Sequence, residues 1–369
     1  MKDSNFCVLY SSYNNYEMLK GEVIKRAFLK DQITINVDDF STNFDISKAE
    51  TICKKNNIYF LKNKKKGVQN AIQTAIDWID EEGKKVDWIL VLQHDIFPGN
   101  KGFYKKLNKI LKNRNLNKVG LLGFNVIGDK DDAFTNNSLE EYLKNKKPTG
   151  YLGVPFLSDT KFEYKRVKKS SYIIFLILKL LNKTYLKKYN FVKRLNEKYR
   201  IHSTAKRDFC PTQFKDFDKV IKKFPPLFTI DLPVWAGVAI NIDAWKKVIK
   251  PCDDLQFMLW APDVAMQFLI NNYHSAVSRD LYLINDQKCK EKYGLSRSIS
   301  DKSVILDPSK NQLDETNLFQ KIFKDRWGFS YGNVKNEYPK LSKRYKNTLV
   351  EKYYNHDIRN GPLFNLSID

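Results

Sequence analysis

The chain contains few cysteines, prolines and glycines. It has 5 cysteines, 12 prolines and 15 glycines among 369 residues. The cysteine number is odd and no two cysteines have the spacing CxxC, which argues against a disulfide scaffold or a Cys-rich zinc site and favours a reducing compartment. The low glycine and proline content excludes collagen-like and low-complexity chains.

Long apolar runs are also missing. No stretch reaches the roughly 20 apolar residues that a membrane-spanning helix needs. The apolar run at residues 6–10 is too short for the core of a secretory signal. We therefore expect a cytoplasmic protein, with peripheral attachment to the inner face of the membrane as an option.

Acidic residues are scarce relative to basic ones. The chain has 42 Asp and Glu against 64 Lys and Arg, a net charge of +22. This balance favours a polyanionic partner, such as nucleic acid, anionic lipid or a phosphorylated substrate. The 42% of hydrophobic residues, with 24 Phe and 20 Tyr, support a large core. The length predicts two lobes or one large domain with additions.

The first third of the chain alternates between two hydrophobic patterns. Short apolar runs predict strands at residues 6–10, 33–37, 58–61 and 88–92, and helical spacing fills the segments 18–28 and 71–79. This alternation predicts an α/β fold, in which helices flank a mainly parallel, Rossmann-like sheet. Later in the chain the patterns predict strands at 232–242 and 280–284 and helices at 244–248 and 260–270.

Residues 161–200 differ in kind from the rest. Apolar residues recur there at steps of three and four, and lysines and arginines fall largely on another face. The pattern predicts a basic amphipathic helix or helix pair. Residues 165–200 can lie on an anionic membrane surface, or the helix can pack on its own core or in a dimer.

Polar side chains follow two of the predicted strands. Asp38 and Ser41 come after the second strand, where Asp38 can accept a hydrogen bond from a nucleobase or ribose, or merely form a turn. Gln93, His94 and Asp95 follow the fourth strand. Oxygens placed there can hold Mg²⁺ or Mn²⁺ against a diphosphate, while His94 can equally pair with a nearby backbone group.

A further carboxylate, Asp263, stands at the start of a predicted helix. Negative charge at that position is stabilised by the helix dipole, which is one explanation for it. The other is that Asp263 acts as a general base on an acceptor hydroxyl.

An ordered set of motifs resembles the inverting, family-2-type nucleotide-sugar glycosyltransferases with the GT-A fold, mainly over residues 6–100 and 230–285. Val-Asp-Asp-Phe-Ser-Thr-Asn at 37–43 is similar to the family's V-D-[DN]-G-S-x-D, with Phe40 where Gly is usual. Leu-Gln-His-Asp at 92–95 occupies the DxD position without its first Asp. Four further segments match in order: Leu-Tyr-Ser-Ser-Tyr-Asn at 9–14, Gly67 with Ala71 and Gln73, Trp-Ala-Gly at 235–237, and Trp-Ala-Pro-Asp at 260–263. Arg-Trp-Gly at 326–328 resembles a late K-W-G.

The resemblance implies a role for each matching residue. Asp263 would be the catalytic base, and Asp95 would bind a divalent cation, Mn²⁺ or Mg²⁺. The acceptor would contact Trp235, Gly237 and Trp260. The nucleotide-sugar would contact eight residues: Ser12, Asn14, Asp38, Ser41, Gly67, Gln93, His94 and Asp95.

The resemblance also implies partners and a pathway. The donor would be a UDP-, GDP- or dTDP-linked sugar, and the acceptor a glycan or lipid-linked molecule in the synthesis of a cell-surface polysaccharide such as lipopolysaccharide or capsule. No nucleic acid is then expected. Two alternatives are a basic nucleic-acid-binding protein and a sugar nucleotidyltransferase. A sugar nucleotidyltransferase would need a Gly-rich phosphate loop after the first strand. Residues 11–15 contain no Gly, which argues against this alternative.

The same reading divides the chain into four parts. Residues 1–150 would form the nucleotide-sugar-binding half of the GT-A domain and residues 226–289 its acceptor-binding half. Residues 151–225 would be the basic helical insertion, and residues 290–369 a C-terminal extension.

Overall fold

The computed structural model describes most of the chain outside the basic segment. The described residues are 5–27, 29–30, 32–42, 46–99, 102–128, 151–158, 222–286 and 312–366, with the single positions 177, 180, 289, 292 and 293. The amphipathic segment predicted at 161–200 therefore lies outside the described residues, apart from two isolated positions.

Four parallel strands form one half of the sheet. They are β1 (Phe6–Ser12), β2 (Thr34–Asp38), β3 (Ile58–Lys62) and β4 (Trp88–Leu92), in the order β3-β2-β1-β4. Each lies within two residues of the strand that the sequence predicts. The expected α/β fold with a parallel, Rossmann-like core is confirmed.

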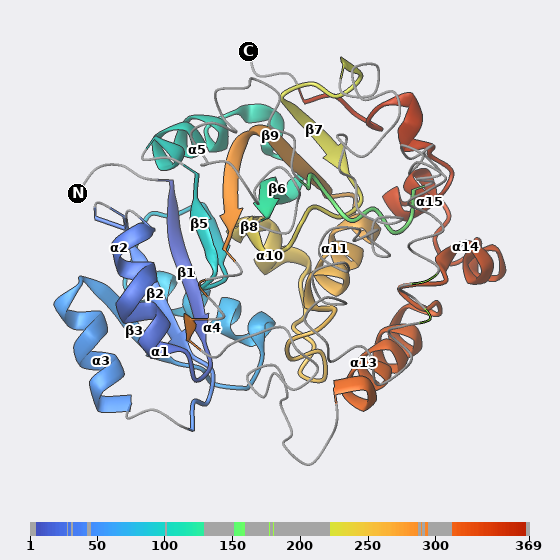
Figure 1. The fold of residues 1–369 in the computed structure, drawn as a ribbon. Coiled ribbons are helices and arrows are strands. Elements are labelled where there is room, and N and C mark those ends of the chain that lie inside the picture. Colours follow the sequence, from blue (N-terminus) through green and yellow to red (C-terminus); the bar gives the residue numbers. More distant parts are fainter. Residues whose placement is uncertain are drawn as a thin grey trace.

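The sheet becomes mixed beyond β4. Strand β8 (Gly237–Asn241) runs antiparallel to β4 and to β6 (Val119–Gly128), and β6 pairs in parallel with the long β9 (His274–Asn285). Two strands, β5 (Ile96–Pro98) and β7 (Leu227–Ile230), run antiparallel to β9. Strands as far apart in the sequence as β1 and β9 thus share one sheet (Figure 1).

The strand expected at 232–242 is shorter than predicted. Regular pairing begins only at Gly237, and the preceding Pro233 forms no more than an isolated bridge with Gly153. Proline has no N–H to donate to a neighbouring strand, which explains why the ladder does not extend through residues 232–236.

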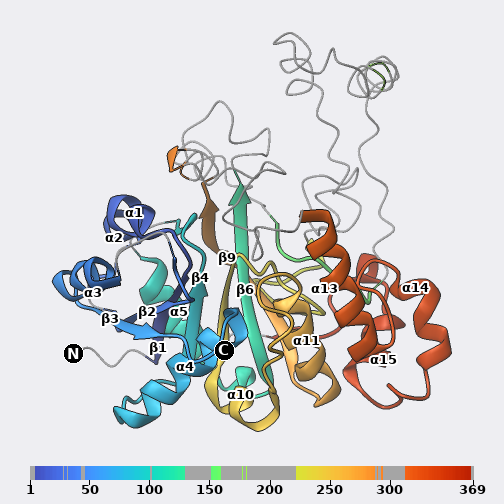
Figure 2. The same ribbon diagram turned by 90° about the horizontal axis from the view of Figure 1, so that it is seen from below.

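Helices cover both faces of the sheet (Figures 1 and 2). One face carries α4 (Val68–Glu81), α10 (Ile242–Val248), α11 (Trp260–Ile270), α13 (Gln312–Trp327) and α15 (Leu349–Tyr354). The other carries a helical segment made of α1 (Tyr16–Met18), η1 (Leu19–Val23) and α2 (Ile24–Arg26), together with α3 (Ile46–Lys55) and α5 (Phe103–Leu111). The other short helices among the described residues are α14 (Val334–Glu337), η2 (Arg114–Leu116), η5 (Tyr338–Leu341) and η6 (Ile358–Asn360).

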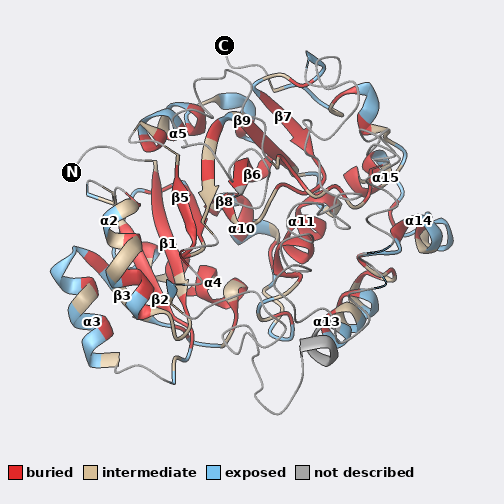
Figure 3. Cartoon of the chain, viewed as in Figure 1, coloured by how far each residue is buried: buried red, intermediate tan, exposed pale blue. Residues whose placement is uncertain are grey.

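The core sits on both sides of the sheet. In β1, Cys7 and Leu9 face one apolar cluster while Phe6, Val8 and Tyr10 face the other, as the alternation of a strand requires. Figure 3 shows the strands almost entirely buried and the outer surfaces of the helices exposed. The polar residues that lie buried near strand ends therefore stand out against an apolar interior.

Among the residues that the structure describes, no helix combines the length and the apolar character that a transmembrane span requires.

The half-buried imidazole of His274, at the start of β9, predicts a pH dependence of stability. Burial lowers its pKa from 6.5 to about 4. Between pH 6.5 and 4 the imidazole is protonated in the unfolded chain but neutral in the folded one. The stability that neutral His274 allows is therefore complete above pH 6.5 and is lost as the pH falls towards 4. We expect the urea midpoint of the wild type to fall more steeply between pH 7 and 4 than that of His274→Gln. Parallel curves for the two proteins would contradict this expectation.

Candidate functional site

Polar side chains meet where three neighbouring parallel strands end. Ser12 at the end of β1 lies opposite Asp38 at the end of β2, and β4 flanks β1 on its other side. Ser12 Oγ donates a hydrogen bond to Asn36 Oδ1 (2.6 Å) and lies 3.0 Å from Nε2 of His94, just after β4. We call Ser12, Asn36, Asp38 and His94 the carboxyl-edge cluster. All four are buried, at the edge where parallel sheets bind their ligands.

Asp38 is oriented by two donors. Tyr16 Oη donates to Oδ1 (2.8 Å), and the backbone N–H of Ser41 donates to Oδ2 (3.3 Å). Burial raises the pKa of Tyr16, and the nearby Asp38 charge adds to the effect, so the hydroxyl stays protonated as a donor. A carboxylate offers about four acceptor positions, and these two bonds leave room for a ligand N–H or hydroxyl.

The loops after β1 and β2 are cross-linked. The backbone N–H of Asn14 donates to Ser41 Oγ (3.0 Å), and the backbone N–H of Thr42 donates to Asn14 Oδ1 (2.8 Å). Asn14 and Phe40 both adopt positive φ, 55° and 63°, which residues other than Gly rarely do. The structure thus brings the predicted Asn14 and Ser41 together with Ser12 and Asp38 in one hydrogen-bonded double loop.

Asp39 connects this double loop to helix α4. Its Oδ1 accepts hydrogen bonds from the backbone N–H of Gly67 (2.8 Å) and from Asn63 Nδ2 (2.8 Å). Burial raises the pKa of Asp39, although both bonds oppose the change. Gly67 has φ of 115°, and a Cβ there would lie 2.8 Å from the Cα of Gln256. Only glycine tolerates both the positive φ and the close approach of the Gln256 backbone, which explains why a glycine occupies position 67.

The turn after β4 holds Gln93, His94 and Asp95 in place. The N–H of Gln93 donates to the carbonyl of Ala236 (3.3 Å), and the ring of His94 contacts that of Tyr10. Asp95 is fully buried, and its backbone carbonyl accepts the N–H of Asp286 (2.9 Å). This turn therefore lies beside the end of β1, next to the carboxyl-edge cluster.

The donor groups near Asp95 do not fit a metal centre built by the protein. The nearby Asp286 carboxylate is bound by Arg26 Nη1 (2.7 Å), whose guanidinium lies 3.9 Å from the ring centre of Phe97. Gln93 offers only a neutral oxygen, and no group of three His, Cys, Asp or Glu suited to a metal occurs in the described part of the chain. Mg²⁺ and Mn²⁺ favour several charged oxygens, and Asp95 alone supplies one carboxylate.

Asp263 lies away from any accessible surface. Its Oδ1 accepts a hydrogen bond from Trp327 Nε1 (2.8 Å) and pairs with Arg326 Nε (2.8 Å). Its Oδ2 accepts from Gln69 Nε2 (3.1 Å) and Gln267 Nε2 (2.9 Å). The residue is 0% exposed, and burial raises its pKa against the effect of these partners. In this arrangement Asp263 contacts protein groups only, which does not fit the expected base that meets an acceptor hydroxyl.

The predicted acceptor residues are only partly brought together. Trp235 is half-buried and its ring contacts Tyr331 edge-on, next to the backbone that holds Gln93. Gly237 is the first residue of β8, and a Cβ there would come within 2.4 Å of Leu283 Cδ1, so it serves close packing. Trp260 is 4% exposed and belongs to the core. Of the three, Trp235 alone lies at the protein surface.

Sequence reasoning missed several residues of this site. Asn36, Asp39, Asn63 and Gln69 are buried polar side chains that connect the predicted ones. Asn36 interrupts an apolar strand, which was a usable signal. Gln69 gave none, because its partners Asp263 and the N–H of Cys252 are more than 180 residues away.

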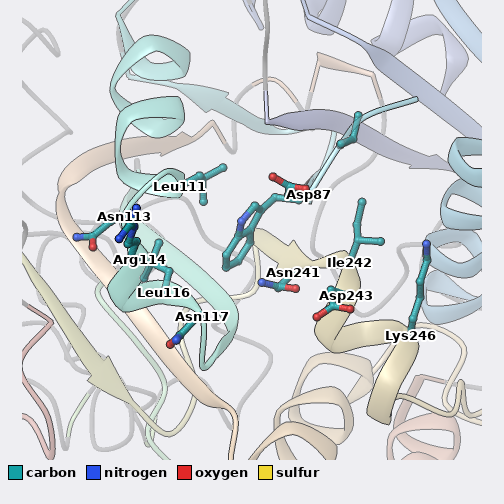
Figure 4. Close-up of a pocket in the computed structure, with 12 residues that line it drawn as sticks. Asp87, Leu111, Asn113, Arg114, Leu116, Asn117, Asn241, Ile242, Asp243 and Lys246 are labelled. Atoms are coloured by element: carbon teal, nitrogen blue, oxygen red, sulfur yellow. The ribbon is translucent and has the colours of Figure 1, made fainter. Parts of the chain in front are cut away.

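A cavity of about 400 Å³ lies at the opposite edge of the sheet (Figure 4). It is lined where β4 begins and β8 ends, by residues that include Asp87, Trp88, Asn241 and Asp243. None of the sequence-predicted site residues lines it. Its charged Asp243 is already paired with Lys247 (2.6 Å). We therefore place the candidate site at the carboxyl edge.

No family model matches the chain, and no curated protein matches it. Solved structures align with the chain at low TM-scores and low sequence identity. Staphylococcus aureus TarS 1–349 aligns at TM-score 0.36 and 11% identity over 92% of this chain and 77% of its own. GalNAc-T7 with UDP, GalNAc and Mn²⁺ aligns at TM-score 0.44 and 12% identity, over 96% of this chain and 56% of its own. A mycobacterial protein aligns at TM-score 0.40 and 9% identity, over 89% of this chain and 76% of its own. Likenesses at this level leave the function to be argued from the site.

The contacts of Asp263 predict that it stabilises the fold. Asp263→Asn removes the buried negative charge that pairs with Arg326. Such a change lowers the free energy of unfolding by on the order of 3 kcal/mol. We expect Asp263→Asn to unfold at a clearly lower denaturant concentration than the wild type, with an unchanged dependence of the unfolding free energy on denaturant concentration. The control is Asp243→Asn, at the start of α10, whose surface ion pair contributes under about 1 kcal/mol. A residue that served only as a catalytic base would leave the midpoint unchanged.

Proposed function

We propose that the protein is a glycosyltransferase that takes a sugar from a nucleoside-diphosphate donor bound at the carboxyl edge of the sheet. The observation that carries this proposal is the cluster at the ends of β1, β2 and β4, where Ser12, Asp38 and His94 are buried yet lie at the rim. Aligned acceptor groups at this edge suit a nucleoside, and the cross-linked loops around them are rigid before any ligand binds.

Within this proposal, each predicted residue has a task. Asp38 accepts a hydrogen bond from the base, and Ser12, Asn14 and Ser41 hold the loops in shape. Gly67 fixes the start of α4 against the residue 256 backbone. Gln93, His94 and Asp95 lie where the diphosphate and sugar would follow from the nucleoside.

Positive charge is available for a diphosphate. The segment 62–66 contains four lysines. Lys64 and Lys65 form ion pairs with Asp77 (2.7 Å) and Asp253 (2.8 Å), whereas Lys62, at the end of β3, is in register with Asp38. The ammonium of Lys66 lies 4.8 Å from the ring centre of Tyr13, in the loop after β1. Fixed cations close to a leaving diphosphate stabilise the charge that develops during transfer.

The acceptor would approach from the side of Trp235. The ring of Trp235 contacts Tyr331, which also contacts Phe156, and a cavity of about 150 Å³ lined by Phe156, Tyr331 and Asn333 adjoins them. Aromatic faces with nearby amides suit a sugar ring. A glycan or lipid-linked acceptor, single displacement with inversion, and a role in surface-polysaccharide synthesis stay predictions, as does membrane contact through residues 165–200.

In place of catalysis, we propose a positioning role for Asp263. It joins α4, which starts beside the donor loops, to α11 and the Arg326–Trp327 segment. The two sides of the site are thereby held at a fixed separation, which in-line transfer between donor and acceptor requires.

A nucleotide-binding measurement tests the proposed function. Calorimetric titration with UDP, GDP and dTDP is expected to give saturable binding of at least one, and Asp38→Asn to weaken it roughly ten-fold, because a charged acceptor is lost. Asp87→Asn, at the opposite edge, is the control and should bind as the wild type does. Binding of an oligonucleotide but of no nucleoside diphosphate would favour the nucleic-acid alternative.

The donor groups at Asp95 predict a weak dependence of this binding on metal. Since one carboxylate is available, we expect the nucleoside diphosphate to raise the melting temperature in EDTA and Mn²⁺ to add little to that shift. The measurement is a thermal shift with EDTA, Mg²⁺ or Mn²⁺. A shift that occurs only with a divalent cation would show that the cation completes the site.

A further inference from the structure

Phe40 presents an apolar ring at the rim of the candidate site. It follows Asp38 and Asp39 directly and is 49% exposed. Its φ of 63° lies in the left-handed region, which is unfavourable for a bulky side chain. An exposed phenyl group and a strained backbone both disfavour phenylalanine here, so folding alone does not account for it.

The backbone around Phe40 is fixed on both sides. The N–H of Asp39 donates to the carbonyl of Ser12 (2.7 Å), and the Asp39 side chain holds the N–H of Gly67. After Phe40, the N–H of Ser41 donates to Asp38, and Ser41 Oγ accepts from Asn14. Such bonds can maintain a strained residue, and strain of this kind is typical of binding sites.

The ring and the carboxylate together match one chemical group. Asp38, two residues before Phe40, has acceptor positions for an N–H, and Phe40 adds an exposed apolar ring on the same loop. A nucleobase has an N–H edge and a flat π-face, and base–aromatic stacking tolerates any base. We propose that Phe40 packs its ring against the nucleobase whose edge Asp38 binds. This inference rests on the proposed donor site and adds the residue that stacks on the base.

Two substitutions separate the ring from the backbone. Phe40→Asn removes the ring but keeps a residue that accepts the left-handed conformation, whereas Phe40→Tyr keeps the ring. With UDP, GDP or dTDP, whichever the wild type binds best, we expect Phe40→Asn to lose roughly ten-fold in affinity and Phe40→Tyr to bind as the wild type does. The melting temperature of Phe40→Asn should not fall.

Inorganic pyrophosphate distinguishes contact with the base from an effect on the loop. Phe40→Asn should bind pyrophosphate as the wild type does, because pyrophosphate has no base to stack. The control Phe364→Asn removes a 38% exposed ring that packs on His274, at the far edge of the sheet, and should bind the nucleotide normally.

The outcomes separate this inference from the proposed function. If the wild type binds no nucleoside diphosphate, the donor site itself is wrong. If the wild type binds but Phe40→Asn binds equally well, or loses nucleotide and pyrophosphate alike, the donor site stands and the role of Phe40 is overturned.

Discussion

One buried carboxylate, that of Asp39, connects the parts of this site. It binds the N–H of Gly67 and the amide of Asn63, and so fixes the loop after β2 to the start of α4. Two residues into α4, Gln69 reaches Asp263 and the backbone of Cys252. Further contacts join the same parts, among them the N–H of Asn63, which donates to the carbonyl of Asp38 (2.9 Å), and the ion pair of Lys65 with Asp253 (2.8 Å).

Two acidic residues near strand or helix ends thus have distinct environments. Asp38 has two protein donors and remaining acceptor positions at the rim, which suits a ligand. Asp263 has protein partners on both oxygens and no exposed surface, which suits a joint between elements. Residue type and sequence position alone could not separate these roles, because a carboxylate close to the end of an element serves either.

The sequence pattern predicted the parallel half of the fold well, because the apolar runs of β1, β2 and β4 are buried on both faces and all four strands end in polar turns. It also predicted that Ser12, Asp38 and His94 would lie at a common edge. The mixed half was harder, because antiparallel partners such as β8 and β4 are separated by about 150 residues and leave no local pattern. The late start of the strand predicted at 232–242 depended on Pro233, whose missing N–H was visible in the sequence.

By itself, the sequence determined the α/β class, the strand ends and the residue types available there, since hydrophobic periodicity and turn residues act locally. Only the tertiary structure decided which of those residues meet. It placed Gln69 against Asp263, Arg26 against Asp286, and the strained Phe40 at the open rim beside Asp38. These outcomes depend on burial and on hydrogen bonds between distant segments, which exist only once the sheet has brought those segments together.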